Sequence, residues 1–106
     1  MRVAERERLP NRREATTFDV EALRLHFRAT VGKYPDGRIG ELFISNHRVN
    51  SMAGIMASDA AVVASIALQY GVLLDVIPHA LMRDVRGRAS GPLGAVLDFL
   101  AEETLG

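Results

Sequence analysis

One stretch of ten residues constrains the fold more than any other part of the chain. From Leu23 to Gly32, apolar and polar side chains alternate, which is the period of a β-strand with one buried face and one wet face. The turn residues Pro35, Asp36 and Gly37 follow, and a second apolar run covers residues 39–45. Proline presets the φ angle of a turn, and Asp-Gly readily supplies positive φ. The sequence therefore predicts an antiparallel hairpin.

A shorter alternation over residues 17–21 predicts a third antiparallel strand, joined to the hairpin by a tight turn near Glu21 and Ala22. The second half of the chain changes period. Residues 60–70 are apolar nearly all round, and their polar strip consists of Ser65, Gln69 and the preceding Ser58. A helix of this kind is expected to be buried on two sides.

The predicted boundaries of this helix are Ser58 as N-cap and Gly71 as a left-handed C-terminal residue. The preceding segment, residues 46–56, is either an adaptable partner-binding loop or an early start of the same helix. We favour the early start, because Met52, Ile55 and Met56 fall near one helical face.

Two more helices are predicted. A short one covers residues 75–82, with Asp75 as N-cap and Pro78 in its first turn. An amphipathic one begins at Pro92 and carries apolar residues at helical spacing up to Ala101. The expected fold is α+β: a small antiparallel sheet of two or three strands, packed on one face by three helices.

A chain of 106 residues fits one domain. We expect residues 1–14 to form a flexible Arg/Glu-rich leader and residues 15–106 to form the α+β domain. The leader has no apolar block typical of a signal peptide, and the longest apolar run, residues 60–68, is about half of the ~20 residues that a membrane span needs. A cytoplasmic location without membrane insertion is predicted.

Charge and cysteine content exclude several functions. Thirteen basic and thirteen acidic residues balance, so no global field attracts nucleic acid, and glutamates interrupt the basic leader. Nucleic-acid binding is therefore disfavoured. The sequence has no cysteine, which excludes thiolate metal sites and thiyl-radical chemistry for these residues. Because its three histidines are scattered, no metal or cofactor is predicted.

The segment of residues 83–92 is the candidate ligand site. Its arginines and glycines lead into the N-terminus of a helix, where backbone N–H groups and the helix dipole favour anions. The residues expected to bind a nucleotide or phosphate are Arg86, Arg88, Ser90 and Gly91. The alternative is a solvated helix–helix loop in which Ser90 only caps the last helix.

Self-association is also expected. A small sheet leaves free strand edges, and a helix that is apolar all round leaves hydrophobic surface uncovered in a single copy. The sequence therefore predicts a homo-oligomer, with a homodimer as the simplest case.

Three blocks, residues 33–43, 59–72 and 87–94, together resemble the TSCPD domain, and residues 5–13 resemble the segment that precedes it. That domain occurs near the C-terminus of adenosylcobalamin-dependent ribonucleotide reductases and in small free-standing proteins. The resemblance implies a non-catalytic accessory or regulatory module, which binds itself or the large chain of a reductase. No catalytic residue is implied. The alternative function is a nucleotide- or anion-binding protein that uses the loop of residues 86–94.

Overall fold

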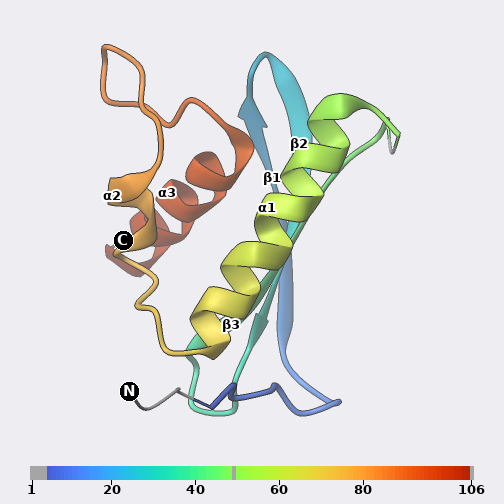
Figure 1. Ribbon diagram of the computed structural model, residues 1–106, viewed down its shortest axis with the longest axis vertical. Coiled ribbons are helices and arrows are strands. Elements are labelled where there is room, and N and C mark those ends of the chain that lie inside the picture. Colours follow the sequence, from blue (N-terminus) through green and yellow to red (C-terminus); the bar gives the residue numbers. More distant parts are fainter. Residues whose placement is uncertain (1–4, 49, 106) are drawn as a thin grey trace.

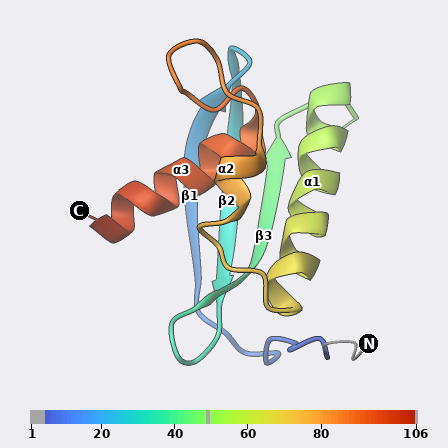
Figure 2. The same ribbon diagram turned by 60° about the vertical axis from the view of Figure 1, so that its left-hand side comes forward.

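Three antiparallel strands precede three helices in the computed structural model, which describes residues 5–48 and 50–105 (Figure 1). The sheet has the order β1-β2-β3; α2 and α3 lie over one face of it, whereas α1 runs beside its β3 edge (Figure 2). This arrangement confirms the predicted α+β class and the third strand. The elements are β1 (Ala15–Ala22), β2 (Leu25–Lys33), β3 (Ile39–Asn46), α1 (Met52–Gln69), α2 (Ile77–Ala80) and α3 (Pro92–Leu105).

The central strand β2 follows the predicted alternation. Phe27, Ala29 and Val31 are buried beneath the helices, whereas Arg28 on the opposite face pairs with Asp19 of β1 at 3.3 Å. The sheet therefore has one dry face and one polar face, as an antiparallel sheet with helices on one side should have.

The β1–β2 turn lies two residues later than predicted. Ala22 pairs with Leu25, so the turn consists of Leu23 and Arg24, and their φ angles are +57° and +58°. Two positive φ angles match the right-handed twist of a hairpin. They cost about 1–2 kcal/mol each in residues other than glycine. The predicted turn at Glu21 and Ala22 was wrong, because neither Leu23 nor Arg24 carries the usual turn signal.

Helix α1 begins at Met52, which confirms its early start. The Ser51 hydroxyl accepts the N–H of Gly54 at 3.1 Å, so Ser51 is the N-cap and the prediction of Ser58 was wrong. Gly71 follows the helix with a φ of +100°, as predicted.

The length and composition of α1 are sufficient to cross a membrane. The expectation of no membrane span rested on the shorter run of residues 60–68. In the structure one side of α1 is packed against β3, and helices in the core of a soluble protein pass the same test.

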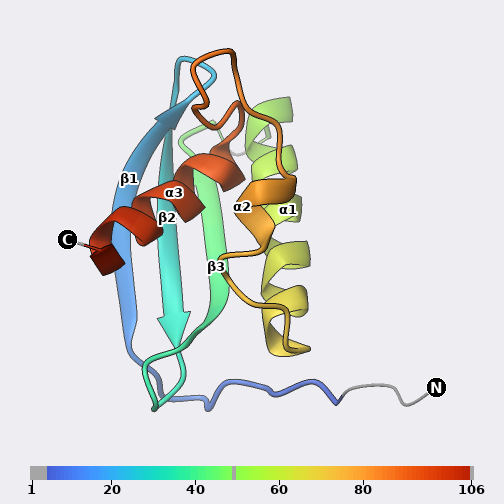
Figure 3. The same cartoon turned by 90° about the vertical axis from the view of Figure 1, so that its left-hand side faces the viewer.

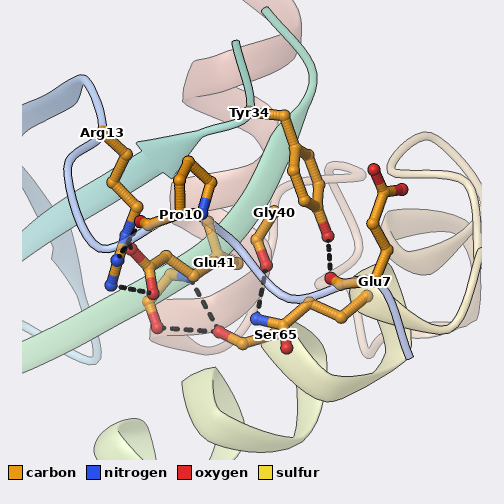
Figure 4. Close-up of polar contacts among 9 residues, drawn as sticks. Glu7, Pro10, Arg13, Tyr34, Gly40, Glu41 and Ser65 are labelled. Atoms are coloured by element: carbon orange, nitrogen blue, oxygen red, sulfur yellow. Dashed lines mark hydrogen bonds and ion pairs between the residues drawn. The ribbon is translucent and has the colours of Figure 1, made fainter. Parts of the chain in front are cut away.

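The polar strip of α1 lies along the outer edge of β3 (Figure 4). The buried Ser65 hydroxyl accepts the Leu42 N–H at 2.8 Å and lies 3.1 Å from the Leu42 carbonyl oxygen. The Gln69 side chain donates to the Gly40 carbonyl at 2.9 Å. These two side chains take the place of a neighbouring strand for part of the edge, so α1 is fixed in both position and rotation.

The last two helices cover the rest of the sheet. Helix α2 has only four residues, and it follows Val76 without a side-chain cap, so the prediction of Asp75 as N-cap was wrong. Pro78 lies in the first turn as predicted. Helix α3 begins at Pro92, crosses β1 and β2 (Figure 3), and stacks Phe99 on Phe18 with ring centroids 4.2 Å apart.

We predict that Ser65→Ala destabilises the domain by about 1–3 kcal/mol, because the buried N–H of Leu42 loses its acceptor. The matched control is Ser58→Ala in the same helix. Ser58 is exposed, so its free energy of unfolding should change by no more than about 0.5 kcal/mol. Urea unfolding followed by circular dichroism measures both values. Equal effects for the two variants would contradict the edge-capping role of Ser65.

Candidate functional site

The N-terminal segment crosses the end of the sheet and reaches the last turn of α1 (Figure 4). The Glu7 N–H donates to the Gln69 carbonyl at 2.8 Å, and the Tyr34 hydroxyl donates to the Glu7 carbonyl at 2.5 Å. The Glu7 carboxylate accepts two hydrogen bonds from Arg38, at 3.0 and 3.1 Å. Burial raises the pKa of Tyr34, so this phenol stays protonated, and remains a hydrogen-bond donor, to more alkaline pH than a free tyrosine.

A second anchor is the ion pair of Arg13 with Glu41, which lies on β3. Both guanidinium contacts reach the same carboxylate, one of them at 3.1 Å, and the hydrogen bond to Glu41 raises the pKa of Arg13. Gly32 on the neighbouring strand makes room for it, because a Cβ there would lie within 2.2 Å of a Glu41 oxygen. The Glu41 side chain is only 11% exposed.

The flexibility of the leader, residues 1–14, stays a prediction. Residues 1–4 lie outside the described residues. The contacts of Glu7 and Arg13 hold the rest of the leader on the domain, so we expect residues 7–13 to be more rigid than their composition suggests.

We predict that Glu41→Gln makes the leader several-fold more sensitive to limited trypsin digestion, because it weakens the charged contact that holds Arg13. Mass spectrometry should show faster cleavage after Arg8 and Arg12. Cleavage after the exposed Arg86 is the internal control and should keep its rate. If the wild type loses its leader as fast as the variant, the anchor does not hold in solution.

The predicted ligand residues lie together at one loop. Arg83 and Ala89 form a β-bridge that closes the loop, and Gly87 at its tip has a φ of +80°. Arg86 and Arg88 are exposed, whereas Ser90 and Gly91 are half-buried at the start of α3.

Several N–H groups of this loop already donate hydrogen bonds to carboxylates of the same chain. Asp84 accepts the N–H groups of Arg86 and Arg88, both at 2.9 Å, and the Arg88 side chain at 3.2 Å. The backbone N–H of Arg88 is the main reason that the pKa of Asp84 is lowered. At the base of the loop, Arg83 binds Asp98 of α3 with two contacts of 2.8 and 2.9 Å. Binding of an anion by this loop stays a prediction. Among the residues that the structure describes, Arg86 is the exposed arginine of the loop whose side chain forms no ion pair.

A cavity of about 650 Å³, lined by both charged and apolar residues, lies beside the loop. Its charged lining residues carry both signs, so the cavity by itself has no preference for anions. These residues are Glu21, Arg24, Asp84, Arg88 and Asp98.

Helix α1 has mostly small residues on its buried side and large apolar residues on its exposed side, the reverse of the usual arrangement. Its sheet-facing side is made mostly of small residues, among them Gly54, Ala57 and Ala61, which are buried, and Leu68 is the one large apolar residue of α1 in the core. The other large apolar residues of α1 point away from the sheet, and Met52 and Val63 are 77% and 68% exposed. We call the outward row the α1 stripe; its members are Met52, Met56, Asp59, Val63, Ile66 and Tyr70.

An apolar groove of about 690 Å³ continues the α1 stripe toward α3. It shares Met52 and Met56 with the stripe, and methionine side chains adapt readily to different partners. On its other side the groove is lined by Leu81, Met82 and Leu93. The sequence indicated a helix buried on two sides; the structure shows which side is uncovered in a single chain. Exposed apolar surface of this kind is typical of an interaction site.

No group of three metal-ligating side chains is found among the residues that the structure describes. Of the three histidines, His26 lies 3.6 Å from the carboxylate of Asp19 on the polar face of the sheet.

The geometry therefore defines the protein as a small α+β module with an exposed apolar face on helix α1. Comparison with curated proteins finds segments of three vitamin B12-dependent ribonucleotide reductases. The enzyme of Agrobacterium fabrum is 41% identical over 73 residues, that of Rhodopirellula baltica 42% over 72, and that of Bradyrhizobium diazoefficiens 38% over 73. These matches cover 67–68% of this chain.

The chain spans only 6–7% of the length of these enzymes. It is thus related to a small part of a B12-dependent ribonucleotide reductase. No family model matches the sequence, and no solved structure matches it.

Proposed function

We propose that this chain is a TSCPD-like accessory or regulatory module, located in the cytoplasm, that associates with the large chain of a B12-dependent ribonucleotide reductase or with a second copy of itself. Identity of about 40% to a segment of such enzymes supports the relation. These 106 residues contain no cysteine, so they supply no thiol for radical chemistry. A role in binding accounts for both facts.

The observation that carries the proposal is the α1 stripe. Five of its six residues are large and apolar, and all five are more than a third exposed. Full burial of one such side chain contributes about 1.5–3 kcal/mol. A partner that covers the α1 stripe therefore gains several kcal/mol, which is sufficient for a specific complex once the entropy cost of association is met.

We predict that the protein co-elutes with purified full-length reductase of Agrobacterium fabrum, or forms a dimer on its own, in size-exclusion chromatography with light scattering. Val63→Glu should weaken either association about tenfold or more, because it places a charge in the middle of the apolar contact.

The matched control is Val85→Glu, in which the same change is made at a fully exposed loop residue outside the α1 stripe. This variant should bind as the wild type does. Circular dichroism should show both variants folded, because both side chains are exposed. A wild type that stays monomeric and has no affinity for the reductase would contradict the proposal.

Nucleotide or phosphate binding at the loop of residues 86–94 is the second candidate. The exposed Arg86, next to a cavity lined by Arg88 and Ser90, favours it. A bound polyphosphate must compete with the Asp84 carboxylate for the N–H groups of the loop. Arg86 is therefore the residue on which such binding should depend most.

For this candidate, we predict that ATP or tripolyphosphate at 100 times its dissociation constant stabilises the fold by about 2.7 kcal/mol, and raises the melting temperature by about 10 °C. Arg86→Ala should remove most of the shift. Arg28→Ala, on the polar face of the sheet, is the control and should keep it. Unchanged melting of the wild type with both ligands would exclude the loop as a polyphosphate site.

A further inference from the structure

The α1 stripe has the spacing of a coiled-coil seam. Its members follow one another at intervals of four, three, four, three and four residues, which is the spacing of the a and d positions of heptads. Helices with such a seam pack side by side along their length. The stripe therefore fits a partner helix of similar length better than a strand or a flat surface.

Asp59 interrupts the apolar seam near its middle. It is exposed, and the ion pairs of the described residues do not include it. It is the single charged side chain within Met52–Gln69. A carboxylate enclosed in an apolar contact is costly without a partner of opposite charge. Whatever covers the stripe must therefore bring a cation to Asp59.

A second copy of α1 does not meet this requirement. In an antiparallel pair related by a two-fold axis, the seam positions match as Met52 with Tyr70, Met56 with Ile66, and Asp59 with Val63. The two Asp59 carboxylates then lie close to the axis, and α1 has no lysine, arginine or histidine to neutralise them. A lipid surface also leaves Asp59 without a cation in an apolar medium.

We infer that the α1 stripe is a docking site for an amphipathic helix of another protein, with apolar residues at its a and d positions and one arginine or lysine at a central core position that pairs with Asp59. A single polar core residue fixes register and partner choice in coiled coils. Asp59 performs this selection here: it attracts the partner and opposes self-pairing. The inference rests on the proposed function, because it specifies the partner surface of the same module.

Two designed 18-residue helical peptides test the inference. Both carry leucine at the core positions in the spacing of the α1 stripe, and they differ at one central core position, which holds arginine in one peptide and glutamate in the other. Fluorescence anisotropy measures their binding to the full chain. The wild type should bind the arginine peptide about fivefold more tightly than the glutamate peptide. Asp59→Asn should remove the difference, and Asp59→Arg should reverse it.

Three results would overturn the inference: binding of neither peptide, the same preference in all three proteins, or an affinity for the two peptides that Val63→Glu leaves unchanged. Light scattering tests whether a second copy binds to the α1 stripe, and vesicle binding tests whether a membrane does. A wild-type dimer that Val63→Glu dissociates, or binding to neutral phosphatidylcholine vesicles that Val63→Glu abolishes, would replace the helix by a second copy or a membrane.

The peptide result and the reductase result are independent. Reductase binding without a charge-dependent peptide preference refutes the helix-docking inference and leaves the proposed function in place. The expected peptide preference without reductase binding supports the docking site and removes the reductase as its partner.

Discussion

The contact between the polar strip of α1 and the edge of β3 determines the rest of the structure. Ser65 and Gln69 bind the backbone of Leu42 and Gly40, so the rotation of the helix about its axis is fixed. Once these polar residues face the strand edge, the alanines beside them face the sheet, and their small size permits close approach. Apart from Leu68, which is buried, the large apolar residues of α1 then lie on its outer face. The exposed α1 stripe is thus a consequence of how the sheet edge is closed.

Gln69 connects three parts of the molecule through one side chain and its backbone. Its amide nitrogen donates to Gly40, its side-chain oxygen accepts from Arg6 at 2.6 Å, and its carbonyl accepts the Glu7 N–H. The N-terminal segment therefore closes over the end of α1, where Tyr34 and Arg38 also hold it. This segment lies at the end of the helix, so it leaves the α1 stripe along the side of α1 exposed.

The sequence was sufficient to predict those helices and strands that have a clear local pattern of apolar and polar residues. The alternation around Phe27 predicted β2 and its buried face, and Pro92 marked the start of α3. Features that depend on tertiary contacts were missed or misplaced. The Leu23-Arg24 turn lacks the usual turn residues and is imposed by the pairing of β1 with β2. Ser58 resembles an N-cap in the sequence, but Ser51 is the residue whose hydroxyl accepts a backbone N–H at the start of α1.

The site residues show the same limit. Arg86, Arg88, Ser90 and Gly91 lie close together because they are neighbours in the sequence, but sequence reasoning gave no sign that Asp84 would accept the N–H groups of Arg86 and Arg88. The outward direction of Met52 and Val63 was equally hidden, because an all-round apolar helix does not show which side is covered. The exposed row of large apolar side chains on α1 is a surface that a partner could cover, which is the physical basis of the proposed association.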